Sequence, residues 1–183
     1  DPLSYASAAE RMLRAIGASN FTAAQVREAL DVAAAQGLPR YAVLQPEYNL
    51  FDRAGFDGPL RDLALAEGLA VICYYSLASG FLTGKYRSAA DLAQSPRGAG
   101  IGQKYLTPRG LRILAALDAV AARHAAQPGE VALAWLMARP GVTAPIASAS
   151  NVAQVEGLVR ATQLQLSADD VEALDAASAP EAA

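Results

Sequence analysis

Three short apolar segments of this chain begin at residues 13, 41 and 69, so each starts 28 residues after the one before. The segments cover residues 13–18, 41–45 and 69–74, and a fourth at 142–147 follows much later. Each has the length of a strand and precedes a stretch with helical signals. Strands that alternate with helices pair in parallel, because the helix carries the chain back before the next strand starts. The sequence therefore predicts an α/β fold with four parallel strands.

Helix signals follow each apolar segment. Thr22 and Gln25 form a capping-box pattern, and Gly37 ends the same stretch. Thr107 followed by Pro108 is another helix start, since proline fits the first helical position. The predicted helices cover residues 22–37, 59–67, 107–124, 129–138 and 167–177, with one more that starts at Asn151.

Length and composition limit the possible classes of protein. With 183 residues, 53% hydrophobic and 18% charged, the chain is expected to form a single domain over residues 1–183. A net charge of −3 without a run of Lys or Arg argues against a nucleic-acid partner. No apolar run is long enough to cross a bilayer, and the single cysteine, Cys73, cannot form an intrachain disulfide. We expect a cytoplasmic protein without a membrane partner, in which Cys73 is a small buried side chain.

A long segment separates the third and fourth predicted strands. Residues 80–107 contain several glycines and no strong helical period, so we expect an irregular loop. Ordered loops of this length are usually functional, which favours a flap that covers a cofactor or substrate. A disordered surface loop is the alternative.

Polar residues follow the first three strands, at the ends where parallel α/β proteins build their sites. Ser19 and Asn20 can bind an amide, and Gln45 can both donate to and accept from a carboxamide. Tyr74 can stack on a flat ring, and Lys85 adds a positive charge after a Ser/Gly-rich turn. Taken singly, each has an ordinary explanation as a turn residue, a strand terminus or a core side chain.

Three motifs carry a resemblance to a known family. They are Gly-Ala-Ser-Asn at 17–20, Gln-Pro-Glu-Tyr-Asn at 45–49 and Ser-Gly-Phe-Leu-Thr-Gly-Lys at 79–85. In this order they closely resemble the aldo/keto reductases, and the similarity runs from about residue 15 to residue 178. The resemblance implies a (β/α)8 TIM-barrel fold, of which this chain would hold about four βα units, the C-terminal half. It also implies reduction of aldehydes or ketones to alcohols by NADPH, with NADH possible.

The resemblance further implies where the dinucleotide would bind. Ser19, Asn20 and Gln45 would hold the nicotinamide carboxamide, and Tyr74 would stack on the nicotinamide ring. The remaining implied contacts are Leu77, Gly80 and Lys85 at the pyrophosphate, and Ser148, Ser150 and Gln154 at the adenosine end. We expect the strand-end residues Ser19, Asn20, Gln45, Tyr74 and Ser150 to line one continuous cleft, and we expect no metal site.

Several departures from the family leave the choice between NADPH and NADH open. The family often has a basic residue near the ribose 2′-phosphate, but no Lys or Arg lies between Pro145 and Val159. Leu158 stands where the family often has an asparagine, and Tyr75-Ser76 stands where it has Ser-Pro. The substrate and the oligomeric state are also left open by the sequence.

The family's catalytic residues have no counterpart in this sequence. The resemblance places an Asp, a Tyr, a Lys and a His on the first four barrel strands, and nothing before Gly17 supplies such a set. The one histidine, His124, is expected near the end of a helix, where a cation is favourable. We therefore expect no catalytic residue among these 183 residues, no turnover by them alone, and a need for the N-terminal half-barrel.

Alternative interpretations concern what the half-barrel does. It could be a non-catalytic nucleotide-binding or regulatory subunit of the same fold, an inactive fragment, or a half-barrel that self-associates through its open sheet edges. The stretch before residue 16 is too short for the helix, turn and strand that precede this point in the family. That shortness predicts either a truncated product or a break in the chain between residues 1 and 16.

Overall fold

The computed structural model describes residues 14–94 and 97–180. Strands β1 (Ile16–Ser19), β2 (Tyr41–Gln45), β3 (Ala70–Cys73) and β4 (Ala144–Pro145) form one sheet in the order β1-β2-β3-β4. All three neighbouring pairs are parallel, which confirms the predicted α/β fold. The predicted strand start at Leu13 and most of the region of the predicted chain break, residues 1–13, lie outside the described residues.

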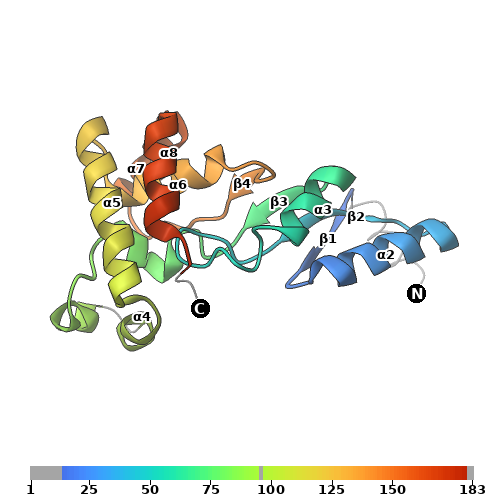
Figure 1. Cartoon of the computed structure of the whole chain (residues 1–183), viewed down its shortest axis with the longest axis horizontal. Helices are drawn as coiled ribbons and strands as arrows, with labels where there is room; N and C mark the ends of the chain where they lie inside the picture. Colours follow the sequence, from blue (N-terminus) through green and yellow to red (C-terminus); the bar gives the residue numbers. More distant parts are fainter. Residues whose placement is uncertain (1–13, 95–96, 181–183) are drawn as a thin grey trace.

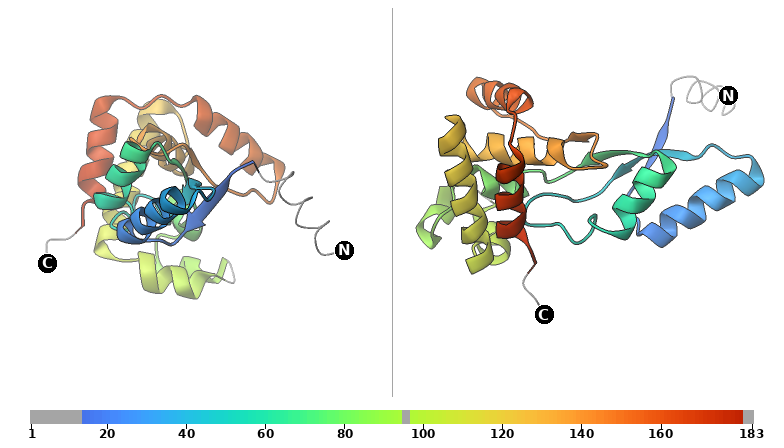
Figure 2. Two further views of the ribbon diagram at one scale, coloured as in Figure 1. Left: turned by 90° about the vertical axis from the view of Figure 1, so that its right-hand side faces the viewer. Right: turned by 45° about the horizontal axis from the view of Figure 1, so that its top comes forward.

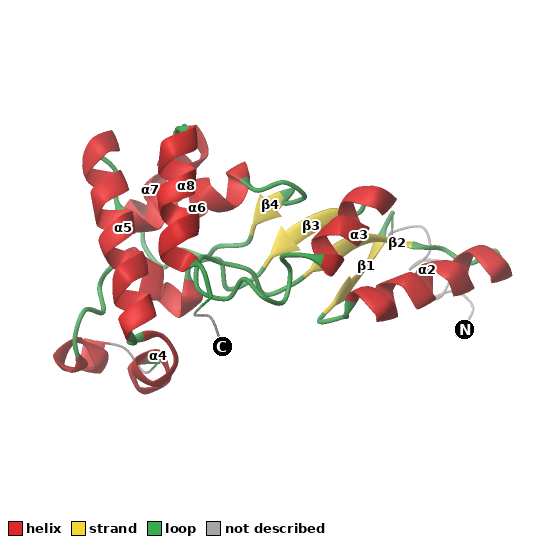
Figure 3. Ribbon diagram, viewed as in Figure 1, coloured by secondary structure: helices red, strands yellow, loops and turns green. Residues whose placement is uncertain are grey.

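The sheet extends away from a cluster of helices (Figure 1). Helices α2 (Ala23–Gln36) and α3 (Pro59–Glu67) lie beside β1 and β2. The cluster at the other end consists of α5 (Pro108–His124), α6 (Pro128–Ala138), α7 (Val152–Gln163) and α8 (Ala168–Ser178), as the right-hand view of Figure 2 also shows. β3 and β4 lie nearer the helical cluster than β1 and β2, and β3 points toward that cluster (Figure 3).

The helix ends follow the local signals of the sequence. Thr22 and Gln25 make the predicted capping box, and α2 ends before Gly37, which has a φ of 65°. Thr107 caps α5 through a bond from the backbone N–H of Gly110. Asn151 caps α7 in the same way, through a bond from the backbone N–H of Gln154. These ends depend on neighbouring residues alone, which is why the sequence predicts them well.

The strands are shorter than predicted at the edge of the sheet. The fourth segment, predicted over residues 142–147, pairs as a strand only at Ala144–Pro145. The backbone N–H groups of Thr143 and Ile146 still donate to Val71 and Cys73. β4 has a neighbouring strand on one side only, and Pro145 has no N–H to donate, so the ladder is short.

The expectation of an irregular loop over residues 80–107 was wrong. The segment contains most of the 3-10 helix η1 (Ala78–Thr83), a second 3-10 helix, η2 (Ala89–Gln94), and helix α4 (Gly98–Tyr105). A Cβ atom added at Gly98 would meet the carbonyl oxygen of Leu92 at 1.7 Å. The glycine therefore allows α4 to pack closely on η2, and its presence does not indicate irregular backbone. That this segment acts as a flap is still a prediction.

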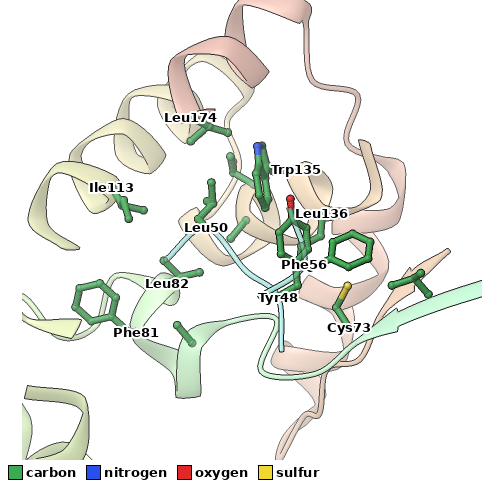
Figure 4. Packing of buried hydrophobic residues seen from close by; sticks show 14 of the residues in the cluster. Tyr48, Leu50, Phe56, Cys73, Phe81, Leu82, Ile113, Trp135, Leu136 and Leu174 are labelled. Carbon is green, nitrogen blue, oxygen red and sulfur yellow. The ribbon is translucent and has the colours of Figure 1, made fainter. Parts of the chain in front are cut away.

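A hydrophobic core joins the helical cluster to the sheet (Figure 4). Tyr48, in the chain between β2 and α3, packs against Phe56 of the same connection and against Trp135 of α6. Its ring centroid is 4.9 Å from that of Phe56 and 5.6 Å from that of Trp135. Leu174 brings α8 into the same cluster. Because the β2–α3 connection is buried here, the ends of the central strands are held firmly against the helices.

Candidate dinucleotide site

A cavity of about 710 Å³ opens where the turn after β3, the start of α6 and the β4–α7 connection meet. Its size is within the range of small-molecule and cofactor sites. Six of the ten residues predicted to bind the cofactor line this cavity, namely Leu77, Gly80, Lys85, Ser148, Ser150 and Gln154. These are the residues predicted for the pyrophosphate and adenosine ends of a dinucleotide.

The other four predicted residues form a separate group at the ends of β1, β2 and β3. The hydroxyl of Ser19 donates to the backbone carbonyl of Gln45 at 2.8 Å. The hydroxyl of Tyr74 donates to Oδ1 of Asn20 at 2.6 Å. Asn20 and Gln45 also line a small hollow of about 10 Å³ with Pro46. These hydrogen bonds thus link the end of β1 to the backbone of β2 and to Tyr74, which follows β3.

The expectation that both groups line one continuous cleft was wrong for this chain. β1 and β4 are at opposite ends of the four-strand order, and neighbouring strands lie about 4.8 Å apart. The ends of β1 and β4 are therefore separated by roughly 14 Å across an open sheet. In a closed barrel the strand ends form a ring, which brings such residues around one opening.

Tyr74 lies at the junction of the two groups. It follows β3 directly and forms an isolated parallel bridge with Glu47, which follows β2. Burial, and then the nearby carboxylate of Glu47, raise the pKa of the Tyr74 hydroxyl above its usual value. The hydroxyl therefore stays protonated near neutral pH and acts as the donor to Asn20.

The cavity also contains charged residues that the sequence pattern did not point to. Arg97, next to the start of α4, and Arg160 of α7 both line it. Arg160 is paired with Glu130 of α6, with its Nη2 2.8 Å from Oε1. Arg160 lies just beyond the stretch that lacks Lys and Arg, so basic groups reach the cavity from elsewhere in the fold. Arg97 belongs to the Ser-Pro-Arg-Gly sequence within residues 80–107, and this sequence could have indicated that Arg97 lies at the site.

Some backbone N–H groups at the start of α7 already donate hydrogen bonds to side chains of the same segment. The side-chain oxygen of Gln154 accepts from the backbone N–H of Ser150 at 2.7 Å and from its hydroxyl at 3.1 Å. The backbone N–H of Gln154 in turn donates to Asn151 at 3.0 Å. An anion in the cavity would therefore rely on cationic side chains such as Lys85 as well as on this helix start.

Two expectations that concern single residues are confirmed. Cys73 is fully buried, and burial raises the pKa of its thiol to about 12. His124 lies in the last turn of α5, where its Nε2 is 2.7 Å from Oδ2 of Asp170. Both residues serve the packing of the fold and lie outside the lining of the cavity.

Within residues 14–94 and 97–180, no group of three or more His, Cys, Asp or Glu side chains is placed to hold a metal ion. In the same ranges, no helix combines the length and apolar character needed to cross a bilayer.

The parallel sheet, its flanking helices and the cavity at the strand ends define an α/β protein of the barrel type with a site of cofactor size. Residues 12–179 match the model of the aldo/keto reductase family. The chain belongs to the aldo/keto reductase family of oxidoreductases, and its four strands represent part of the family's TIM barrel.

Several curated proteins are similar to this chain over most of its length. An uncharacterized oxidoreductase of Mycobacterium tuberculosis is 40% identical over 173 residues, which cover 90% of this chain and 50% of the relative. Protein tas of Escherichia coli is 31% identical over 169 residues, 90% of this chain and 47% of the relative. A probable voltage-gated potassium channel subunit beta of rice is 33% identical over 144 residues, 76% of this chain and 44% of the relative. The chain thus spans about half the length of these relatives and corresponds to roughly their C-terminal half.

Proposed function

We propose that this chain is the cofactor-binding half of an NAD(P)H-dependent reductase that converts aldehydes or ketones to alcohols. The observation that carries the proposal is the cavity, because it gathers six residues predicted from the family resemblance out of two separate parts of the chain, residues 77–85 and 148–154. The hydroxyl of Ser148 and the ammonium of Lys85 are donors, as a dinucleotide's phosphates and riboses require. The residues present therefore fit this cofactor.

Within that function, the chain's residues bind and orient the dinucleotide. Lys85 and Arg97 would bind phosphate oxygens, while Tyr74, held by Asn20, would support the nicotinamide ring. The bound dinucleotide supplies the hydride, and the protein supplies its placement. NADPH is the proposed cofactor, because Arg97 lines the cavity together with the Arg160–Glu130 pair, and a guanidinium group is suited to bind a 2′-phosphate.

Calorimetric titration of the chain with NADPH and with NADH tests this proposal. NADPH should bind more tightly, and Lys85→Gln should weaken the binding of both. Arg27→Gln is a matched control, because Arg27 pairs with Glu67 between α2 and α3, among residues that do not line the cavity. If neither dinucleotide binds at millimolar concentration, the cofactor-binding role is refuted.

Catalysis is proposed to need the N-terminal half-barrel as a partner. The chain alone, mixed with NADPH and a short aldehyde, should show no loss of NADPH absorbance, because the Asp, Tyr, Lys and His of the family are not among its motifs. Turnover by the purified 183-residue chain would contradict this expectation. A protein that joins both halves should restore turnover.

A non-catalytic nucleotide-binding subunit is the second candidate. Its support is the similarity to the rice protein named as a channel subunit beta. Both candidate proteins would bind the cofactor at the same site, but only the reductase would transfer a hydride to a substrate. Dinucleotide binding without turnover by a protein that contains both halves would favour the second candidate, and turnover would favour the reductase.

A further inference from the structure

A carboxylate faces the cavity beside the arginine of α7. Among the described residues that line the cavity, Glu130 of α6 is the single acidic side chain. Its Oε1 accepts from Nε of Arg160 at 2.9 Å, and Nη2 of Arg160 lies 2.8 Å from the same oxygen. Contacts from two guanidinium nitrogens make a strong, directed ion pair. The charge of Arg160 is therefore matched by a carboxylate of the protein itself.

The two members of this pair differ in how firmly they are held. The side chain of Glu130 is 8% exposed, whereas that of Arg160 is 53% exposed. The other carboxylate oxygen of Glu130 accepts from the backbone N–H of Gln127 at 3.1 Å, at the start of α6. Because burial and this helix cap both fix the carboxylate, Glu130 cannot turn away from Arg160 at low cost. Arg160 is the member that has room to move.

The pair lies at the part of the cavity predicted for the adenosine end. A Cβ atom added at Gly157 would lie 3.4 Å from Oε1 of Glu130 and 3.6 Å from Nη2 of Arg160. Gly157 and Gln154 both line the cavity, and residues three apart lie on the same face of a helix. Gln154 belongs to the group predicted for the adenosine end. This is the end where NADPH carries the 2′-phosphate that NADH lacks.

We propose that Glu130 is a specificity-determining residue, which holds Arg160 and thereby limits the preference of this site for NADPH over NADH. A 2′-phosphate near Arg160 would meet the fixed carboxylate as a like charge, and the guanidinium would have to leave that carboxylate to bind the phosphate. A 2′-hydroxyl carries no charge, so NADH would not meet the same opposition. The inference rests on the proposed cofactor-binding function and names the residue that tunes its choice of dinucleotide.

Calorimetric titration of Glu130→Gln with NADPH and with NADH tests the proposal. Glutamine removes the charge but keeps an oxygen that can accept from Gln127, and it is favoured at this capping position. The affinity for NADPH should rise about fivefold, and that for NADH should change by less than about twofold. Glu67→Gln is the matched control, because Glu67 is paired with Arg27 among residues that do not line the cavity. It should change neither affinity.

Arg160→Gln tests the same pair from its exposed side. This variant leaves the carboxylate of Glu130 without its partner, so the affinity for NADPH should fall about fivefold while that for NADH changes by less than about twofold. The double variant should lose the gain of Glu130→Gln, because no guanidinium remains to be released. The measured quantity is the ratio of the two affinities. A general loss of folded protein lowers both affinities equally and leaves this ratio unchanged.

The outcomes distinguish this inference from the function on which it rests. If the wild-type chain binds neither dinucleotide, the proposed function fails, and this inference fails with it. If the wild type binds both and Glu130→Gln leaves the ratio unchanged, the inference alone is overturned. The fragments 2′,5′-ADP and 5′-AMP, which lack nicotinamide, should show the same change in ratio as the dinucleotides. A change seen with the dinucleotides alone would overturn the assignment to the adenosine end.

Discussion

Asp170 joins the start of α8 to the end of α5, and removing it should destabilise the chain measurably. Its carboxylate is 3% exposed. One oxygen accepts from Nε of Arg123 at 3.0 Å, and the other lies 2.7 Å from Nε2 of His124. The backbone N–H of Ser167 donates to it at 3.0 Å as part of the capping box of α8. The carboxylate thus binds three groups from two helices. Of these, His124 lies 46 residues before Asp170 in the chain.

The expected loss follows from these contacts. Asp170→Ala removes one reciprocal half of a helix cap, worth about 1 kcal/mol. It also leaves a partly buried His124 without its acceptor, which costs about 1–2 kcal/mol. Arg123 is half-exposed and adds little. We expect the free energy of unfolding to fall by about 2–3 kcal/mol.

Urea denaturation of the wild type, Asp170→Ala and Asp170→Asn at several pH values provides the assay. The bonds from His124, Arg123 and Ser167 hold the pKa of Asp170 well below its usual range. A depressed pKa means that the contribution is full above the unfolded value of about 4 and is lost as the pH falls below it. The difference between wild type and Asp170→Asn should therefore be constant above about pH 5 and shrink toward pH 3.

Asp169→Asn is the matched control, because Asp169 is the neighbouring acidic residue in the first turn of α8 and is exposed. It should change the free energy of unfolding by less than about 0.5 kcal/mol. A loss for Asp170→Ala no larger than that of the control would refute the role assigned to Asp170.

Three further predictions concern other parts of the chain. The thiol of Cys73, with a pKa raised to about 12, should react with a thiol reagent at pH 8 far more slowly in the folded chain than in urea, and equal rates would contradict its burial. Asp175→Ala should cost about 3 kcal/mol in denaturation, because the largely buried Arg53 and Arg139 both lose their bonds to it; a cost under 1 kcal/mol would contradict this. Tyr74→Ala should weaken NADPH binding by about 1 kcal/mol in calorimetry, and unchanged affinity would rule out stacking.

Features that depend on neighbouring residues were predictable from the sequence. The capping box of Thr22 and Gln25, and the helix over Pro59–Glu67, are observed as expected. The parallel pairing was also predictable, because the long helical connections leave no room for tight antiparallel turns. Ser148 and Lys85 were recognised from sequence motifs, and the structure brings both to one cavity.

Features that depend on distant contacts were not predictable in the same way. The glycines of residues 98–102 suggested a loop, but close packing of Gly98 on Leu92 makes a helix possible there. The cavity contains Arg97 and Arg160, which no local pattern placed beside Ser150. Asn20 and Ser150 line separate hollows because they follow β1 and β4, which lie at opposite edges of an open sheet.

The βα alternation, the helix ends and the family motifs can be recognised from local sequence, because they rest on periodicity and on contacts within a few residues. Which distant side chains meet depends on how the strands and helices pack. Asn49 reaches the carbonyl of Tyr75, which is 26 residues away, only because β2 and β3 lie side by side.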